Sequence, residues 1–145
     1  MRYLAVLLVA VTLPVLAGDA AGQKPELLDK AAIGGAVFER PDVLVLNEND
    51  NTTLDVTSFL SSDSHFGSGM YRSGAVKIDI DEPYGVDEFM YFLEGGVTLT
   101  SSDGTVQVVN AGEAVTIPKE WTGTWETEGY TKIWVIYSDD ESFFE

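Results

Sequence analysis

The sequence predicts a single all-β domain, a sandwich or a barrel. From Asp42 onward, short apolar segments alternate with turn residues at the spacing of roughly eight to twelve residues that is typical of such folds. Helix signals are scarce by comparison. With 145 residues, of which 45% are hydrophobic, the chain is long and apolar enough to bury a core without disulfides or metal.

The pattern predicts one short helix and a series of strands. Pro25–Gly34 has proline near its start and glycine at its end, the usual order for a helix. Asp103-Gly104, between two alternating segments, is a hairpin signal. Ser61–Gly74 is rich in serine and glycine and is predicted to be a loop. The predicted strands are Val43–Leu46, Ala75–Ile80, Glu88–Leu93, Val97–Ser101, Thr105–Val109, Ala114–Ile117, Gly123–Glu126 and Lys132–Tyr137.

The first residues predict an export signal. Arg2 precedes the apolar run Leu4–Ala17, which at 14 residues is shorter than the roughly 20 needed to span a bilayer as a helix. Small residues favour cleavage after Ala17, or as late as Ala20. We therefore expect a signal peptide at 1–17 and a periplasmic or secreted protein. An N-terminal extension (18–41), the β domain (42–137) and an acidic tail (138–145) would follow.

Charge and composition exclude several classes of function. Eight Lys and Arg against 24 Asp and Glu give a net charge of −16, which excludes a binder of the nucleic-acid backbone and disfavours anionic membranes. The absence of cysteine excludes thiol catalysis and disulfides. A single histidine excludes any site that needs two imidazoles.

Three segments together resemble a cupin: Asp87–Gly95 with the following Val97–Thr100, Ala111–Lys119, and Gly123–Glu126. More narrowly, they are similar to the branch that contains ureidoglycine aminohydrolase and the ethanolamine-utilisation cupin. Glu88 and Gly95 keep the Glu-x6-Gly spacing of the first family motif, and Gly112 and Pro118 keep the Gly-x5-Pro spacing of the second. The resemblance implies a cupin jelly-roll, a double-stranded β-helix barrel, and a homodimer.

The sequence departs from the family pattern at the metal ligands. Glu82, Tyr84 and Gly123 stand at positions where cupins carry histidines. Compared with the ureidoglycine branch, Glu82 matches the first ligand, whereas Tyr84 and Glu88 replace histidines. Such an oxygen-only set suits a hard cation but supplies fewer oxygens than such ions prefer. We therefore expect no cofactor. The alternative is manganese or another hard divalent cation on Glu82, Tyr84 and Glu88.

The same resemblance places Tyr84, Glu88 and Trp125 at inward positions, where they would line a pocket. They offer a hydroxyl, a carboxyl and an apolar plane, which together suit a small polar metabolite with hydroxyl, amide or amine groups. An anion would be repelled by Glu82 and Glu88. Strand parity with Gly123 also points Trp125 inward, so simple core packing explains Trp125 equally well. Parity puts Lys77 on the outer face, opposite Ile78.

Two classes of function remain open. The favoured one is an exported, non-redox module that binds a small molecule. The alternative is an enzyme resembling ureidoglycine aminohydrolase or an isomerase, which acts on a small nitrogen-containing metabolite through manganese or through Glu82 and Glu88 sharing a proton. His65 lies in the Ser- and Gly-rich segment and is expected to be a solvated loop residue rather than a catalytic one.

Assembly can also be predicted from the sequence. Glu88–Leu93 barely alternates, and Ile133, Val135 and Tyr137 add further apolar side chains. These residues are more apolar than one small barrel interior requires. We therefore expect the outer face of this region to be covered by a second copy of the chain in a homodimer.

Overall fold

A computed structural model describes residues 24–48 and 50–144, so the predicted signal peptide (1–17, or as far as 20) lies outside the described residues. The all-β prediction is confirmed. No helix in the described part of the chain is long and apolar enough to cross a membrane. The elements are helix α1 (Lys30–Ile33), the 3-10 helices η1 (Ala36–Glu39) and η2 (Glu141–Phe144), and strands β1 (Leu44–Glu48), β2 (Asn51–Leu60), β3 (Phe66–Ser73), β4 (Val76–Ile80), β5 (Asp87–Ser101), β6 (Val106–Asn110), β7 (Ala114–Ile117), β8 (Gly123–Thr127) and β9 (Tyr130–Tyr137).

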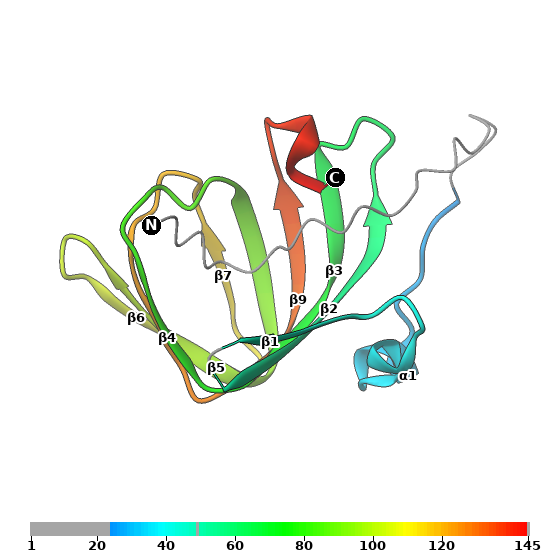
Figure 1. Cartoon of the computed structure of the whole chain (residues 1–145), viewed down its shortest axis with the longest axis horizontal. Helices are drawn as coiled ribbons and strands as arrows, with labels where there is room; N and C mark the ends of the chain where they lie inside the picture. Colours follow the sequence, from blue (N-terminus) through cyan, green and yellow to red (C-terminus); the bar gives the residue numbers. More distant parts are fainter. Residues whose placement is uncertain (1–23, 49, 145) are drawn as a thin grey trace.

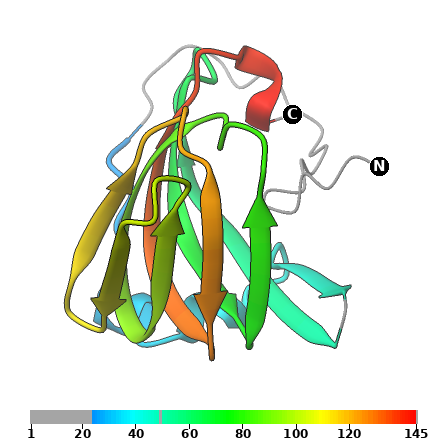
Figure 2. The same cartoon turned by 90° about the vertical axis from the view of Figure 1, so that its left-hand side faces the viewer.

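The strands form one curled antiparallel sheet with the order β1-β2-β3-β9-β5-β8-β4. Strand β5 holds it together, because its first part pairs with β9 and β7 and its second part with β8 and β6. The sheet therefore bends into a half-barrel, open at the top in Figure 1 and seen from the side in Figure 2. This is the curved sheet that a jelly-roll predicts.

The inner face of the half-barrel holds the main core. Side chains alternate between faces along each strand, so Lys132 on β9 faces inward beside Tyr71 on β3 and Phe92 on β5. Trp125 also points inward, as predicted, and is only 1% exposed. The buried members of this core are Tyr71, Ile80, Val86, Met90, Phe92, Val97, Leu99, Val109, Ile117, Trp125, Tyr130, Trp134 and Ile136.

A second, smaller core covers part of the outer face. Helices α1 and η1 bring Val37 and Phe38 against Val56 and Met70 of the sheet. Asp29 caps α1, since its Oδ1 accepts a hydrogen bond from the Ala32 amide at 2.8 Å. The predicted helix at Pro25–Gly34 is therefore confirmed over its final turn only.

The predicted loop at Ser61–Gly74 is wrong, because most of it forms strand β3. Its glycines are required by close packing rather than by a turn. A Cβ atom at Gly69 would lie 2.0 Å from the Val56 carbonyl oxygen and 2.6 Å from the Trp134 ring. The small residues therefore let β3 pack closely between β2 and β9, a tertiary requirement that local composition does not reveal.

Gly95 lies between the predicted strands Glu88–Leu93 and Val97–Ser101, but the structure has one continuous strand there. Strand β5 continues through it, and the irregularity is a shift in the β5–β9 register between Phe92 and Glu94. Gly95 has a positive φ of +67°. A bulge bends a strand without breaking it, and here the left-handed Gly95 follows the bulge closely, which explains how β5 serves both halves of the sheet.

Candidate functional site: a buried Glu88–Lys132 pair

A buried ion pair lies at the centre of the inner face. The Nζ atom of Lys132 on β9 lies 2.6 Å from Oε1 of Glu88 on β5. The Lys132 and Glu88 side chains are only 5% and 4% exposed. Because charges buried this deeply are costly unless they are paired, each side chain requires the other. The pair carries no net charge, although the surrounding protein is strongly acidic.

The second oxygen of Glu88 is also engaged. Tyr84, in the segment between β4 and β5, donates its hydroxyl to Glu88 Oε2. Burial raises the pKa of Tyr84 well above its usual value, and the negative charge of Glu88 raises it further. The Tyr84 hydroxyl therefore keeps its proton across the physiological range and acts as a hydrogen-bond donor.

Aromatic rings surround the Lys132 ammonium group. Its Nζ lies 5.4 Å from the centre of the Trp125 ring, 5.5 Å from Tyr71 and 5.8 Å from Tyr130. It also lies 3.0 Å from the sulfur of Met90. Ring faces attract cations, most strongly where water is excluded. The rings therefore add to what Glu88 contributes in holding a charge inside the barrel.

All three rings of this cage carry a polar atom that lacks a partner. Among the residues that the structure describes, Trp125 Nε1 and the hydroxyls of Tyr71 and Tyr130 are buried and make no hydrogen bond. The Trp125 and Tyr130 ring centres are 5.8 Å apart. A buried polar group without a partner costs about 1–3 kcal/mol, so each such group requires an explanation. A bound molecule that forms hydrogen bonds with Trp125 Nε1 and the Tyr130 hydroxyl would remove this cost for both groups.

Asp55 on β2 is a further carboxyl group near this site. Its Oδ1 accepts a hydrogen bond from Trp134 Nε1 at 3.1 Å. Burial raises the pKa of Asp55 to about 6, although the Trp134 bond and the charge of Lys132 oppose the rise. Because the folded pKa lies above the unfolded value, the protonated carboxyl stabilises the fold at low pH. That contribution is lost as the pH rises through about 6.

We expect Asp55→Asn to stabilise the protein at pH 7.5 by about 1–2 kcal/mol, since asparagine keeps the acceptor for Trp134 and removes the charge. The gain should shrink as the pH falls below about 6. Urea unfolding at several pH values measures it. Asp79→Asn is the matched control, because Asp79 is exposed and likewise accepts one hydrogen bond, from Thr124. An equal effect of both variants at every pH would contradict the prediction.

The structure brings together three of the four residues singled out from the sequence. Glu88 bonds to Tyr84, and Lys132 links Glu88 to the ring of Trp125. Glu82 is instead exposed, so it does not share the interior with Glu88. The expected repulsion of anions also loses its basis, because Lys132 neutralises Glu88 and Glu82 lies outside.

Lys132 itself was missed. It lies in the predicted strand Lys132–Tyr137, but the sequence pattern assigned it no role. Lys77 lies on the outer face as predicted, 3.2 Å from Glu126. Strand parity puts Lys132 on one face with Trp134 and Ile136, but the opposite face of the strand is apolar as well, so parity alone could not show that Lys132 faces inward.

The residues present do not fit a bound metal. Both Glu88 oxygens are taken by Lys132 and Tyr84, and the Lys132 ammonium group would repel a cation at this position. Among residues 24–48 and 50–144, no three His, Cys, Asp or Glu side chains lie close enough together to hold an ion. We therefore derive no chemistry through a metal here.

Comparison with known proteins places this geometry in a family context. Residues 74–132 match the family model described as the EutQ-like cupin domain. This stretch runs from the end of β3 to Lys132 and contains Tyr84, Glu88 and Trp125. No curated protein matches the chain.

Solved structures share the fold at low sequence identity. The EutQ protein of Clostridium difficile is 24% identical with a TM-score of 0.54, over 68% of this chain and 78% of that one. A DUF861-family protein of unknown function from Pseudomonas syringae is 21% identical with a TM-score of 0.57, over 66% of this chain and 41% of that one. The Cnp3 cupin domain of Schizosaccharomyces pombe is 12% identical with a TM-score of 0.52, over 68% and 71%. Similarities at this level describe the fold and leave the chemistry to the site.

Proposed function

Because residues 74–132 of this chain match the family model of the EutQ-like cupin domain, we propose that the chain binds a small polar metabolite inside the half-barrel without redox chemistry. The inner face carries a neutral Glu88–Lys132 pair, aromatic walls and the polar tip of Tyr84. Aromatic and apolar walls with a few fixed polar groups are typical of small-ligand sites.

The observation that carries the proposal is the pair of unpartnered atoms on Trp125 and Tyr130. Trp125 Nε1 is a donor, and the Tyr130 hydroxyl both donates and accepts. Burial raises the pKa of Tyr130 well above its usual value, so this hydroxyl keeps its proton. A neutral ligand with a carbonyl or hydroxyl oxygen would satisfy both groups. It would also leave the Glu88–Lys132 pair unbroken.

An enzyme is the second class of function, and the site supports it less well. Acid–base work by Glu82 and Glu88 requires the two carboxyls to share a proton, yet Glu82 is exposed and both Glu88 oxygens are bonded elsewhere. Manganese chemistry is disfavoured because both Glu88 oxygens are already bonded, to Tyr84 and to the cationic Lys132. We accordingly propose that protein purified without added metal carries well below one equivalent, which elemental analysis tests.

The proposal includes export. Its test is the N-terminal sequence of the mature protein, which we expect to begin at Gly18 or within about three residues of it. Membrane-bound protein that retains Met1 would overturn this part. The binding proposal does not depend on the result.

Trp125→Phe tests the site, because it keeps an aromatic filler and removes the indole N–H. We expect at least a tenfold loss of affinity for any neutral metabolite that raises the melting temperature of the parent protein, corresponding to about 1.4 kcal/mol or more. Isothermal titration calorimetry measures the affinity. The control is Val108→Ala, a change to an exposed apolar side chain on β6, away from the expected dimer face. Unchanged affinity in Trp125→Phe would mean that Trp125 only packs the core.

We also propose a homodimer formed through the outer face of β5 and β9. Within the single chain this face is left uncovered: Phe89 is 43% exposed, Tyr91 37% and Tyr137 48%. Phe89→Glu should shift the protein from dimer to monomer in light scattering at micromolar concentration, because a charge would replace an apolar contact. Val108→Glu on β6 is the control, because Val108 is an apolar side chain that is 60% exposed and lies elsewhere. A monomeric parent protein would contradict the proposal.

A further inference from the structure

We propose that the C-terminal segment Ser138–Phe144 is a lid seated in one mouth of the half-barrel, and that its opening controls access to the interior. The inference rests on the proposed function, because it takes this mouth as the entrance for the ligand. Helix η2 lies at the end of the sheet where β3 begins and β9 ends (Figure 1), and it stands above the strands in the side view (Figure 2). The sequence analysis expected only an acidic tail here.

The seat of the lid is next to the ion pair. Gly67 on β3 lies opposite Ile136 on β9, and Ile136 lies opposite Glu88 on β5. Phe143 and Phe144 are half-buried and pack against the same interior core as Trp125. The two rings also contact each other edge to face, with centres 5.0 Å apart. The lid therefore closes over the Glu88 end of the site.

Gly67 provides the space that the lid occupies. A Cβ atom there would lie 2.7 Å from the Phe144 ring, closer than real contacts allow. The clash involves only the flexible end of a side chain, so a larger residue would push Phe144 out while leaving β3 in place. Gly67 is thus a position from which closure can be tested without altering the lid itself.

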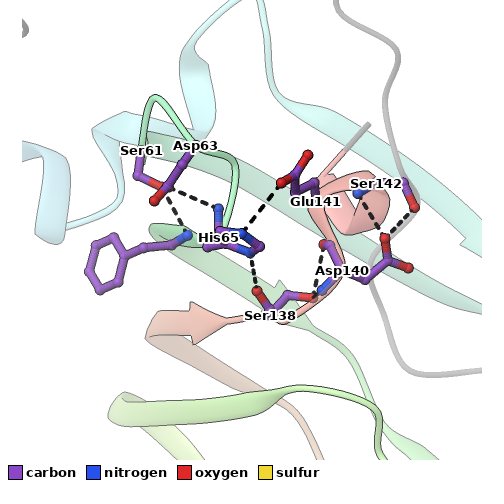
Figure 3. Close-up of polar contacts among 8 residues, drawn as sticks. Ser61, Asp63, His65, Ser138, Asp140, Glu141 and Ser142 are labelled. Carbon is purple, nitrogen blue, oxygen red and sulfur yellow. Dashed lines mark hydrogen bonds and ion pairs between the residues drawn. The ribbon is translucent and has the colours of Figure 1, made fainter.

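A histidine latch joins the lid to the β2–β3 turn (Figure 3). The His65 ring Nδ1 lies 2.7 Å from the Ser138 carbonyl oxygen, and the Ser138 amide donates to the His65 carbonyl at 2.8 Å. Nε2 of the same ring lies 3.7 Å from Glu141 Oε1. Asp63 holds the turn itself by accepting from the His65 amide at 3.2 Å. The lone histidine is thus a bonded residue rather than the solvated one expected.

A second attachment comes from the other wall of the half-barrel. Lys119, which follows β7, forms an ion pair with Asp139. The Lys119 amide donates to Oδ1 of Asp87, at the start of β5, at 2.9 Å. Inside the segment, Asp140 Oδ1 accepts from the Ser142 amide at 2.9 Å, which shapes η2. The lid is therefore tied at its base to both sides of the mouth.

The contacts of residues 141–144, beyond the attached base of the lid, are weak enough for this part to detach. Helix η2 has four residues, none of them fully buried, and only its two phenylalanines reach the core. The His65–Glu141 pair is partly exposed to solvent, and such pairs add little stability. Segments with few buried contacts open locally at a lower free energy than the whole domain unfolds. The expected motion is a swing of residues 141–144 about the fixed Ser138.

Acrylamide quenching of tryptophan fluorescence tests the lid without any ligand. In a Trp121→Phe background the remaining tryptophans are Trp125 and Trp134, each 1% exposed. We expect Phe144→Ala and, separately, Gly67→Ala to raise the Stern–Volmer constant at least twofold without shifting the urea midpoint. Val108→Ala, a change to an exposed apolar side chain on β6 outside the proposed dimer face, is the control and should leave quenching unchanged.

Unchanged quenching in Phe144→Ala would overturn the proposal. So would a rise that appears equally in Val108→Ala, or one that comes with a lowered urea midpoint, because either result indicates loosening of the whole fold. If Gly67→Ala does not fold, Phe144→Ala alone decides. Since acrylamide replaces the ligand, the lid and the binding function can each fail while the other stands.

Discussion

Lys132→Met is expected to lower the free energy of unfolding by about 3–5 kcal/mol, the largest effect of any change at the interior site. Methionine fills nearly the same space, so the loss does not come from a cavity. It comes from Glu88, which stays buried and keeps only Tyr84 as a hydrogen-bond partner among the described residues. Urea unfolding at neutral pH measures the loss.

The double variant shows that the loss is electrostatic. Glu88→Gln alone should cost a similar amount, because it leaves the Lys132 ammonium buried without its counter-charge. Glu88→Gln together with Lys132→Met removes both charges, and glutamine can still accept from the Tyr84 hydroxyl. We expect the double variant to lie within about 1–2 kcal/mol of the parent, so that the two single losses do not add.

The exposed pair of Lys77 and Glu126 is the matched control. Its side chains are 62% and 54% exposed and its charges are 3.2 Å apart, so Lys77→Met should change stability by about 1 kcal/mol or less. Equal losses for Lys77→Met and Lys132→Met would show that burial does not set the value of the pair. Additive losses in the Glu88 and Lys132 double variant would contradict the coupling.

Motif spacing predicted the half of the site that lies on β5 and β8. Glu88 and Gly95 keep a family spacing, and strand parity correctly pointed Trp125 inward. Both signals are local, because the side-chain period of a strand is fixed once one inward residue is known. The inward direction of such residues can be predicted from any sequence in which the strand itself can be recognised.

Lys132, the partner of Glu88, could not be predicted in the same way. Lys132 lies 44 residues further along the chain, in a strand whose two faces are both apolar. Parity therefore did not say which face of β9 is inside. Asp55 and Tyr71 lie in or beside segments whose strands were not predicted, since glycine and serine there reflect contact with Trp134 rather than a turn. The placement of Asp55, Tyr71 and Lys132 depends on how the strands pair across the sheet, which the local sequence does not show.

Gly95→Ala is expected to cost about 3–5 kcal/mol, far more than a positive φ alone explains. Gly95 has φ +67°, which costs another residue about 1–2 kcal/mol. In addition, a Cβ atom there would lie 1.9 Å from the Gly129 carbonyl oxygen and 2.9 Å from the Tyr130 Cα atom. Both neighbours are backbone atoms, so relief requires β5 and β9 to separate at the bulge.

Gly112→Ala separates the two contributions, because Gly112 has a similar φ of +85° and nothing within 4 Å of an added Cβ. It should cost only about 1–2 kcal/mol, the conformational part alone. Urea unfolding of the two variants side by side gives the difference, which we assign to the β5–β9 contact. Equal losses would show that the strands can yield at Gly95. In that case the bulge would not be the fixed joint by which β5 serves both halves of the sheet.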